Sequence, residues 1–228
     1  MSKSKGNVVY PDMLVKRYGL DATRYFLLRE FTFGQDAIFS PEGFVERYNF
    51  DLCNDLGNLL NRTIGMINKY FEGTIPKYNG YKTNFDESLE KETVGYVKKA
   101  EEHMENYHIN NALEEIWKVI SKTNKYIDET MPWALAKEDK KDELASVMYH
   151  LVENLRKVAI MLKPIIAKTS NEILTQLGIN DDKLISWEKI DKYDLLTGDY
   201  KVVQKGTPLF MRLEKEAEIE YIREQMKV

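Results

Sequence analysis

The spacing of apolar residues is most regular between Ser40 and Gly73. In this stretch, residues suited to a buried face recur every three or four positions, at Tyr48, Leu52, Leu56, Leu59, Thr63 and Ile67. That spacing predicts one long helix with a single buried face. Ser40 is suited to cap the start of this helix and Gly73 to close its end. A strip of polar residues is expected along one edge of the buried face, formed by Asp51, Asp55, Asn58, Arg62 and Lys69.

Two members of that strip are candidates for recognition of a nucleobase. Asn58 and Arg62 are four residues apart, so on a helix their side chains lie one turn above the other. An amide beside a planar guanidinium offers several donors and one acceptor, which suits the Watson–Crick edge of an unpaired base. The alternative is a solvated strip in which Arg62 pairs with Asp55 or with a neighbouring helix. These two residues alone leave both interpretations open.

The rest of the chain is predicted to be mainly helical. Two short helices, at Pro11–Tyr18 and Asp21–Arg29, are flanked by apolar segments at Val8–Val9 and Phe31–Phe39 that resemble short strands. The pattern therefore predicts a small β-α-α-β unit over residues 1–39, followed by a helical bundle over residues 40–228. Further helices are expected at 86–107, 109–131, 142–178 with a kink at Pro164, and 213–228, whereas 179–212 reads as irregular.

Trp133 directly follows a break in a predicted helix. Pro132 lacks a backbone donor and clashes with the preceding turn, so the helix must end or kink there. An aromatic residue at such a break can project from the bundle and offer a plane on which an unpaired base stacks. By itself, the position also suits an indole packed in the core.

The composition of the chain excludes several kinds of site and protein class. The net charge of −4 gives no general affinity for nucleic acid, so contacts with RNA would need a local site. The single cysteine, Cys53, excludes an internal disulfide and a cysteine-rich zinc site, and it fits a reducing compartment. The three histidines are scattered without metal-ligand spacing, and no metal site is expected. No apolar run is long enough for a membrane span, so we expect a cytoplasmic protein with no membrane partner.

The first residues, MSKSKGNVV, are basic and contain small residues. Lys3 and Lys5 could belong to a frayed terminus. They could also belong to a loop whose ammonium groups stabilise charge on a polyphosphate.

Taken together, these segments resemble the class I aminoacyl-tRNA synthetases, and within them the methionyl-tRNA synthetase family. Ser2, Lys3, Ser4, Gly6 and Asn7 match the flexible signature loop of that family, although its leading lysine is missing. The resemblance continues at Gly19, Asp21, Arg24, Phe39, Ser40, Asn49, Asp51, Leu52, Asn54, Gly57, Asn58 and Arg62. It then persists over nearly the whole chain. The family's other signature, a histidine motif of the nucleotide-binding fold, is absent, so the resemblance implies a fragment that does not catalyse aminoacylation alone.

The resemblance also implies roles for individual residues. In the family, a loop matched by Ser2, Lys3 and Ser4 contacts ATP, with Lys3 as the catalytic cation, and Mg²⁺ accompanies ATP only in the full-length enzyme. Asn58, Arg62 and Trp133 match residues that recognise the CAU anticodon of tRNA(Met). Residues 1–39 would then contain the signature loop and a unit that contacts the tRNA stem, and residues 40–228 would form the anticodon-binding domain. The catalytic domain of the same enzyme would be a second partner.

Two other functions remain possible at this point. The isoleucyl, valyl, leucyl and cysteinyl enzymes share the signature loop and a helical anticodon domain, although the Asn58, Arg62, Pro132 and Trp133 combination favours the methionyl enzyme. A non-catalytic interaction module derived from a synthetase is the third hypothesis, and it predicts no preference for a CAU loop.

Overall fold

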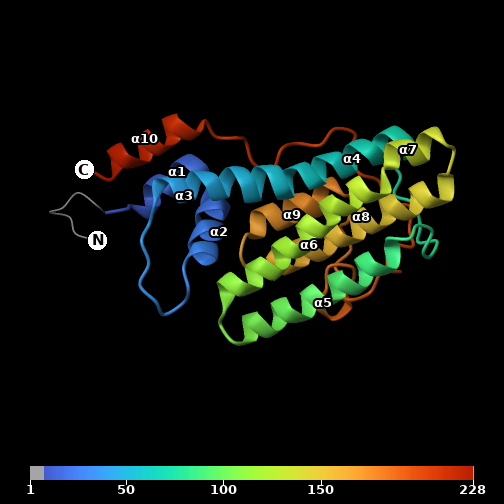
Figure 1. Cartoon of the computed structure of the whole chain (residues 1–228), viewed down its shortest axis with the longest axis horizontal. Helices are drawn as coiled ribbons and strands as arrows, with labels where there is room; N and C mark the ends of the chain where they lie inside the picture. The colour runs from blue at the N-terminus through green and yellow to red at the C-terminus, as the bar shows by residue number, and fades with distance from the viewer. Residues whose placement is uncertain (1–7, 228) are drawn as a thin grey trace.

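The computed structural model describes residues 8–227, and they form a helical bundle (Figure 1). Its elements are α1 (Pro11–Tyr18), α2 (Leu20–Glu30), α3 (Pro41–Arg47), η2 (Tyr48–Gly57), α4 (Asn58–Phe71), α5 (Asp86–Glu105), α6 (Ile109–Thr130), α7 (Pro132–Lys137), α8 (Lys141–Leu162), α9 (Ala167–Gln176), η3 (Trp187–Lys189) and α10 (Lys215–Gln225). In this part of the chain, no helix is both long enough and apolar enough to cross a lipid bilayer.

The predicted long helix is present as α3, η2 and α4 in direct succession. It begins where expected, because the Ser40 hydroxyl accepts a hydrogen bond from the Gly43 amide at 2.9 Å. Its central part, η2, is a π-helix, in which each amide bonds the carbonyl five residues earlier. The predicted apolar positions are all buried, and the long helix ends with Glu72 and Gly73 at positive φ. Cys53 is buried on this helix as well, and burial raises the pKa of its thiol to about 11.

The predicted β-α-α-β unit is wrong in its strands. Residues 8–227 contain no strand, and their one β-type pairing is an isolated bridge between Thr74 and Lys201. Phe31–Phe39 forms a loop that turns where the Gln35 amide bonds the Thr32 carbonyl at 3.1 Å. The apolar side chains of this loop do not share a buried face, since Phe33 and Ile38 are largely exposed. Without a partner strand, an extended apolar run has nothing to pair with. The two helices of the unit are present, however, as α1 and α2.

Helix α8 is the centre of the bundle. It packs against α4, α5, α6, α7 and α9, and from Ser146 to Leu162 all of its residues are buried. Pro164 lies where a kink was expected, but the helix ends at Leu162 and a new one begins at Ala167, so the break is complete.

The irregular segment after α9 covers α8 and is attached to it by buried cations. Arg156 donates to the Leu184 carbonyl at 2.6 Å, and Lys157 donates to the Ile190 carbonyl at 2.7 Å. Burial lowers the pKa of Lys157 to about 7, while Glu153 acts in the opposite direction. The segment crosses close to Gly178, which has a φ of +70°. A Cβ atom there would collide with the Lys201 carbonyl oxygen, so only glycine fits.

The C-terminal helix α10 returns to the start of the chain and lies beside α1 and α3 (Figure 1). Arg17 holds Glu218 through two hydrogen bonds of 2.6 and 2.9 Å, and Lys215 pairs with Glu46 at 2.7 Å. These contacts join the two ends of the described chain on one side of the bundle.

Candidate nucleic-acid interface

Asn58 and Arg62 lie in the first turns of α4, at the edge of its buried face. The same helix has three fully buried residues, Leu59, Thr63 and Ile67. Their burial fixes which face of α4 points to solvent. Asn58 is consequently exposed and Arg62 half-buried. The amide of Asn58 makes no side-chain hydrogen bond with any residue between 8 and 227. It is therefore available to a ligand.

Arg62 forms an ion pair with Asp128 of α6. Its Nη2 lies 2.8 Å from the Asp128 Oδ1, and the two side chains are 38% and 66% exposed. Of the two partners expected for Arg62 in a solvated strip, the neighbouring helix is the one found. An exposed pair of this kind is screened by water and contributes little to stability, about 0–1 kcal/mol. The pair places Arg62 beside the last turn of α6.

The polar residues expected in a single strip contact two different helices. Asp51 contacts α2, whereas Arg62 contacts α6. Asp51 lies in the π-helical part and faces α2, where the Tyr25 hydroxyl donates to its carboxylate at 2.6 Å. The wider winding of η2 changes the direction of its side chains relative to those of α4, and a regular helical periodicity does not describe this change. Asp55 is half-buried in the same segment, and burial, with a further contribution from Asp51, raises the pKa of its carboxyl to about 6.

Trp133 is the second residue of α7 and follows the break that the sequence predicts. Helix α6 ends at Thr130, and Met131 adopts a left-handed conformation with φ 46° and ψ 65°. Pro132 then starts α7, where its fixed φ and missing amide hydrogen suit a first helical position. The indole of Trp133 is 51% exposed, so it is not an interior residue. The indole ring of Trp133, just after the turn at Met131, is therefore accessible to solvent.

These three side chains come from α4 and from the segment that directly follows α6, a helix that α4 contacts. The Arg62–Asp128 pair connects α4 to the end of α6, and α7 follows after a single residue. The two segments therefore carry an amide, a guanidinium and an indole that are each at least partly open to solvent. Such a set can hydrogen-bond the edge of a base and stack on its face.

The remaining predicted site residues, Ser2, Lys3 and Ser4, lie outside the described residues. Within residues 8–227, no three histidine, cysteine, aspartate or glutamate side chains are grouped to hold a metal ion.

Sequence reasoning did not single out Asp128, and it placed Met131 on the buried face of the helix over 109–131, whereas this residue lies just after α6 and is 48% exposed. Asp128 is one of several charged residues on α6, and only the packing of α4 against α6 selects it as the partner of Arg62. Asn124 is a similar case, because its amide donates to the Asp55 carbonyl at 3.1 Å and ties α6 to the end of η2. The proximity of Met131 to Pro132 was the one available signal for the turn.

Comparison with known proteins supplies the family. Residues 1–64 match the family model described as "tRNA synthetases class I (M)", and residues 75–225 match "Anticodon binding domain of methionyl tRNA ligase". Curated relatives named "Methionine--tRNA ligase" from Listeria monocytogenes and Bacillus subtilis are each 56% identical over all 228 residues. The chain spans 34% of the length of these relatives.

Solved structures agree in fold. The methionyl-tRNA synthetase of Mycobacterium tuberculosis bound by methionyl-adenylate superposes with a TM-score of 0.84 at 33% identity, covering 92% of this chain and 41% of that one. Its apo form gives a TM-score of 0.82 at 30% identity, with 91% and 42% covered. Since the anticodon-domain model alone covers well over half of the chain, the chain belongs to the family of methionyl-tRNA ligase anticodon-binding domains.

Proposed function

We propose that this chain recognises the CAU anticodon loop of tRNA(Met) and supplies that recognition to methionine–tRNA ligation. The observation that supports it best is the half-exposed indole of Trp133 at the break that follows α6, the helix to which Arg62 of α4 is joined by its ion pair with Asp128. The family assignment gives this arrangement its context.

Each side chain has a distinct chemical task in this proposal. Trp133 offers a plane for an unstacked base, a contact that contributes about 1–3 kcal/mol in single-strand recognition. Arg62 and Asn58 hydrogen-bond base edges, and the guanidinium donates while the amide both donates and accepts. The proposed recognition is local because the chain as a whole carries a net charge of −4.

The guanidinium of Arg62 is already engaged in the ion pair with Asp128. A base that takes hydrogen bonds from Arg62 must compete with this carboxylate, and the competition is inexpensive because both side chains are substantially exposed. The ion pair also orients the guanidinium before RNA arrives. A side chain that is already ordered loses less rotamer entropy when it binds.

The N-terminal residues belong to the same proposal. Residues 1–39 would contain the ATP loop and a unit contacting the tRNA stem, and residues 40–228 would form the anticodon-binding domain. In a polypeptide with the full length of the relatives, Ser2, Lys3 and Ser4 would contact ATP, whose phosphates Mg²⁺ accompanies. Lys3 would then stabilise charge that develops on the phosphates as methionyl-adenylate forms. Lys3→Ala in such a polypeptide should slow adenylate formation and leave anticodon-loop binding unchanged.

Binding of RNA hairpins tests the central claim. Fluorescence anisotropy would compare an anticodon stem-loop carrying CAU with one carrying a scrambled loop on the same stem, at equal ionic strength, because phosphate contacts alone depend strongly on salt. We expect the CAU loop to bind at least about tenfold more tightly, since each polar base contact contributes on the order of 1–3 kcal/mol by analogy with DNA readout.

Two variants separate base readout from charge. Arg62→Ala should reduce the preference for the CAU loop. Lys69→Ala, which removes an exposed cation farther along the same helix, should leave the ratio of the two affinities unchanged. Equal affinity of the unmodified chain for both loops would exclude anticodon recognition and favour the non-catalytic interaction module.

A further inference from the structure

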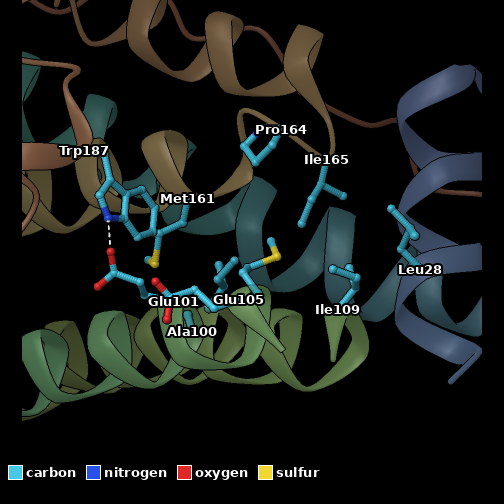
Figure 2. Close-up of a pocket in the computed structure, with 11 residues that line it drawn as sticks. Leu28, Ala100, Glu101, Glu105, Ile109, Met161, Pro164, Ile165 and Trp187 are labelled. Carbon is cyan, nitrogen blue, oxygen red and sulfur yellow. Dashed lines mark hydrogen bonds between the residues drawn. The ribbon is translucent and has the colours of Figure 1, made fainter. Parts of the chain in front are cut away.

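A cavity lies away from the proposed interface. It opens between α2, α5, α6, the junction of α8 with α9, and Trp187, and its volume is about 480 Å³ (Figure 2). Cavities of a few hundred Å³ are the usual size of small-molecule sites. Neither α4 nor α7 contributes to its walls, so this cavity is separate from the region around Arg62 and Trp133.

The break between α8 and α9 helps to form this cavity. Helix α8 stops at Leu162, and Pro164 and Ile165 turn across its end to form one wall. Leu28 of α2 and Trp187 stand at opposite ends of the hollow in Figure 2. Met161 and the other aliphatic lining residues make the interior mostly apolar. A ligand here therefore needs an apolar body.

The polar groups of the cavity carry one sign of charge. Glu101 and Glu105 lie one turn apart on α5, and the lining includes no lysine, arginine or histidine. The Trp187 indole donates a hydrogen bond of 2.6 Å to Glu101, which fixes this carboxylate at the mouth (Figure 2). Glu105 is exposed and forms no ion pair with any other residue in the described range. The cavity thus combines apolar walls, two carboxylates and an indole face.

We propose that this cavity binds a small organic cation, specifically a primary amine attached to an aryl or alkyl body. The ammonium would lie between Glu101 and Glu105, with Trp187 next to it, where ion pairing and attraction to the indole face act together. The apolar body would extend toward Leu28 and Ile109. An anion of the same shape is repelled by both carboxylates, and a neutral alcohol has only hydrogen bonding to offer.

Three ligands of matched shape test the proposal. They are 4-phenylbutylamine, 4-phenylbutan-1-ol and 4-phenylbutyrate, which differ only in the polar end group. Calorimetry on the whole chain would give affinities, and the NMR signal of the Trp187 indole N–H would report the location. We expect the amine to bind about twofold to fivefold more tightly than the alcohol, because a partly exposed ion pair contributes at most about 1 kcal/mol, and the acid to bind most weakly.

Matched variants identify the residues responsible. Glu105→Gln should weaken amine binding about threefold to fivefold and leave alcohol binding unchanged. Glu102→Gln removes an exposed charge on the same helix outside the cavity lining, and it should change neither. Ile109→Trp should fill the edge of the cavity and reduce binding of all three ligands, with thermal melting as the check that the variant is folded.

Three results would each overturn the proposal. They are absence of amine binding up to its solubility, equal affinity for amine and acid, or an indole signal of Trp187 that does not move on saturation. Equal effects of Glu105→Gln and Glu102→Gln would also overturn it. Neither Glu105→Gln nor Glu102→Gln alters a buried residue, so loss of folding does not obscure these two measurements.

Discussion

Replacing Trp133 by alanine tests the proposed interface most directly. The indole is 51% exposed and does not belong to the hydrophobic core. A buried tryptophan replaced by alanine costs about 3–5 kcal/mol of folding free energy, so this half-exposed residue should cost about half as much or less. The bundle should therefore remain folded. Binding should suffer more, since a lost stack of about 1–3 kcal/mol corresponds to a roughly fivefold to 150-fold weaker affinity for the CAU stem-loop.

The assay is fluorescence anisotropy with the CAU hairpin, alongside circular dichroism of the same samples. Trp133→Phe retains an aromatic plane and should retain most of the affinity. Tyr107→Ala is the matched control, because Tyr107 is an aromatic residue that is 71% exposed on the turn between α5 and α6, outside the unit proposed to contact the tRNA stem. If Trp133→Ala stays folded and binds the CAU hairpin as tightly as the Tyr107→Ala control, the stacking role is wrong.

Three further predictions concern stability. In a double-mutant cycle of Arg62→Ala and Asp128→Ala, chemical denaturation should give a coupling energy below about 1 kcal/mol because the pair is exposed; a coupling of several kcal/mol would mean that the pair is a structural element. The pKa of Asp55 is raised from 3.8 to about 6 in the folded state, so folding binds a proton between these values and stability should fall as pH rises from about 4 to 6. Asp55→Asn should flatten that part of the pH profile and be more stable than the unmodified chain at neutral pH, and an unchanged profile would contradict the assignment. Gly178→Ala should lower the free energy of unfolding by at least about 2 kcal/mol, because the methyl group meets the Lys201 carbonyl at a positive φ; a change below about 0.5 kcal/mol in a urea titration would show that the crossing relaxes easily.

Several features of the bundle follow from local sequence. The apolar positions of the long helix repeat at helical spacing from Tyr48 to Ile67, and all of the predicted ones are buried in the structure. Ser40 acts through its own hydroxyl and Pro132 through its own backbone, so the cap and the break were predictable without knowledge of segments distant in sequence. The sequence indicated that the helical segment over 142–178 changes direction at Pro164. It did not indicate that the helix ends there and that a separate helix follows.

The predicted strands show where local reasoning failed. An apolar segment such as Phe31–Phe39 becomes a strand only if another segment pairs with it, and here none does. The buried charges of α8 are a second example, since Arg156 and Lys157 would be placed on a solvated face by composition alone. They are buried because carbonyl groups of residues 184–192 accept their hydrogen bonds.

The sequence by itself thus determined where most of the helices lie, which apolar positions of the long helix are buried, where that helix starts and where α6 stops, because these depend on residues close together in the chain. It also carried the residue pattern that indicated the family. Only the tertiary structure decided the π-helical winding of η2, the pairing of Arg62 with Asp128 and the cavity beside Trp187. Each of these depends on contacts between segments distant in sequence, whose free energies are set by packing rather than by local propensity.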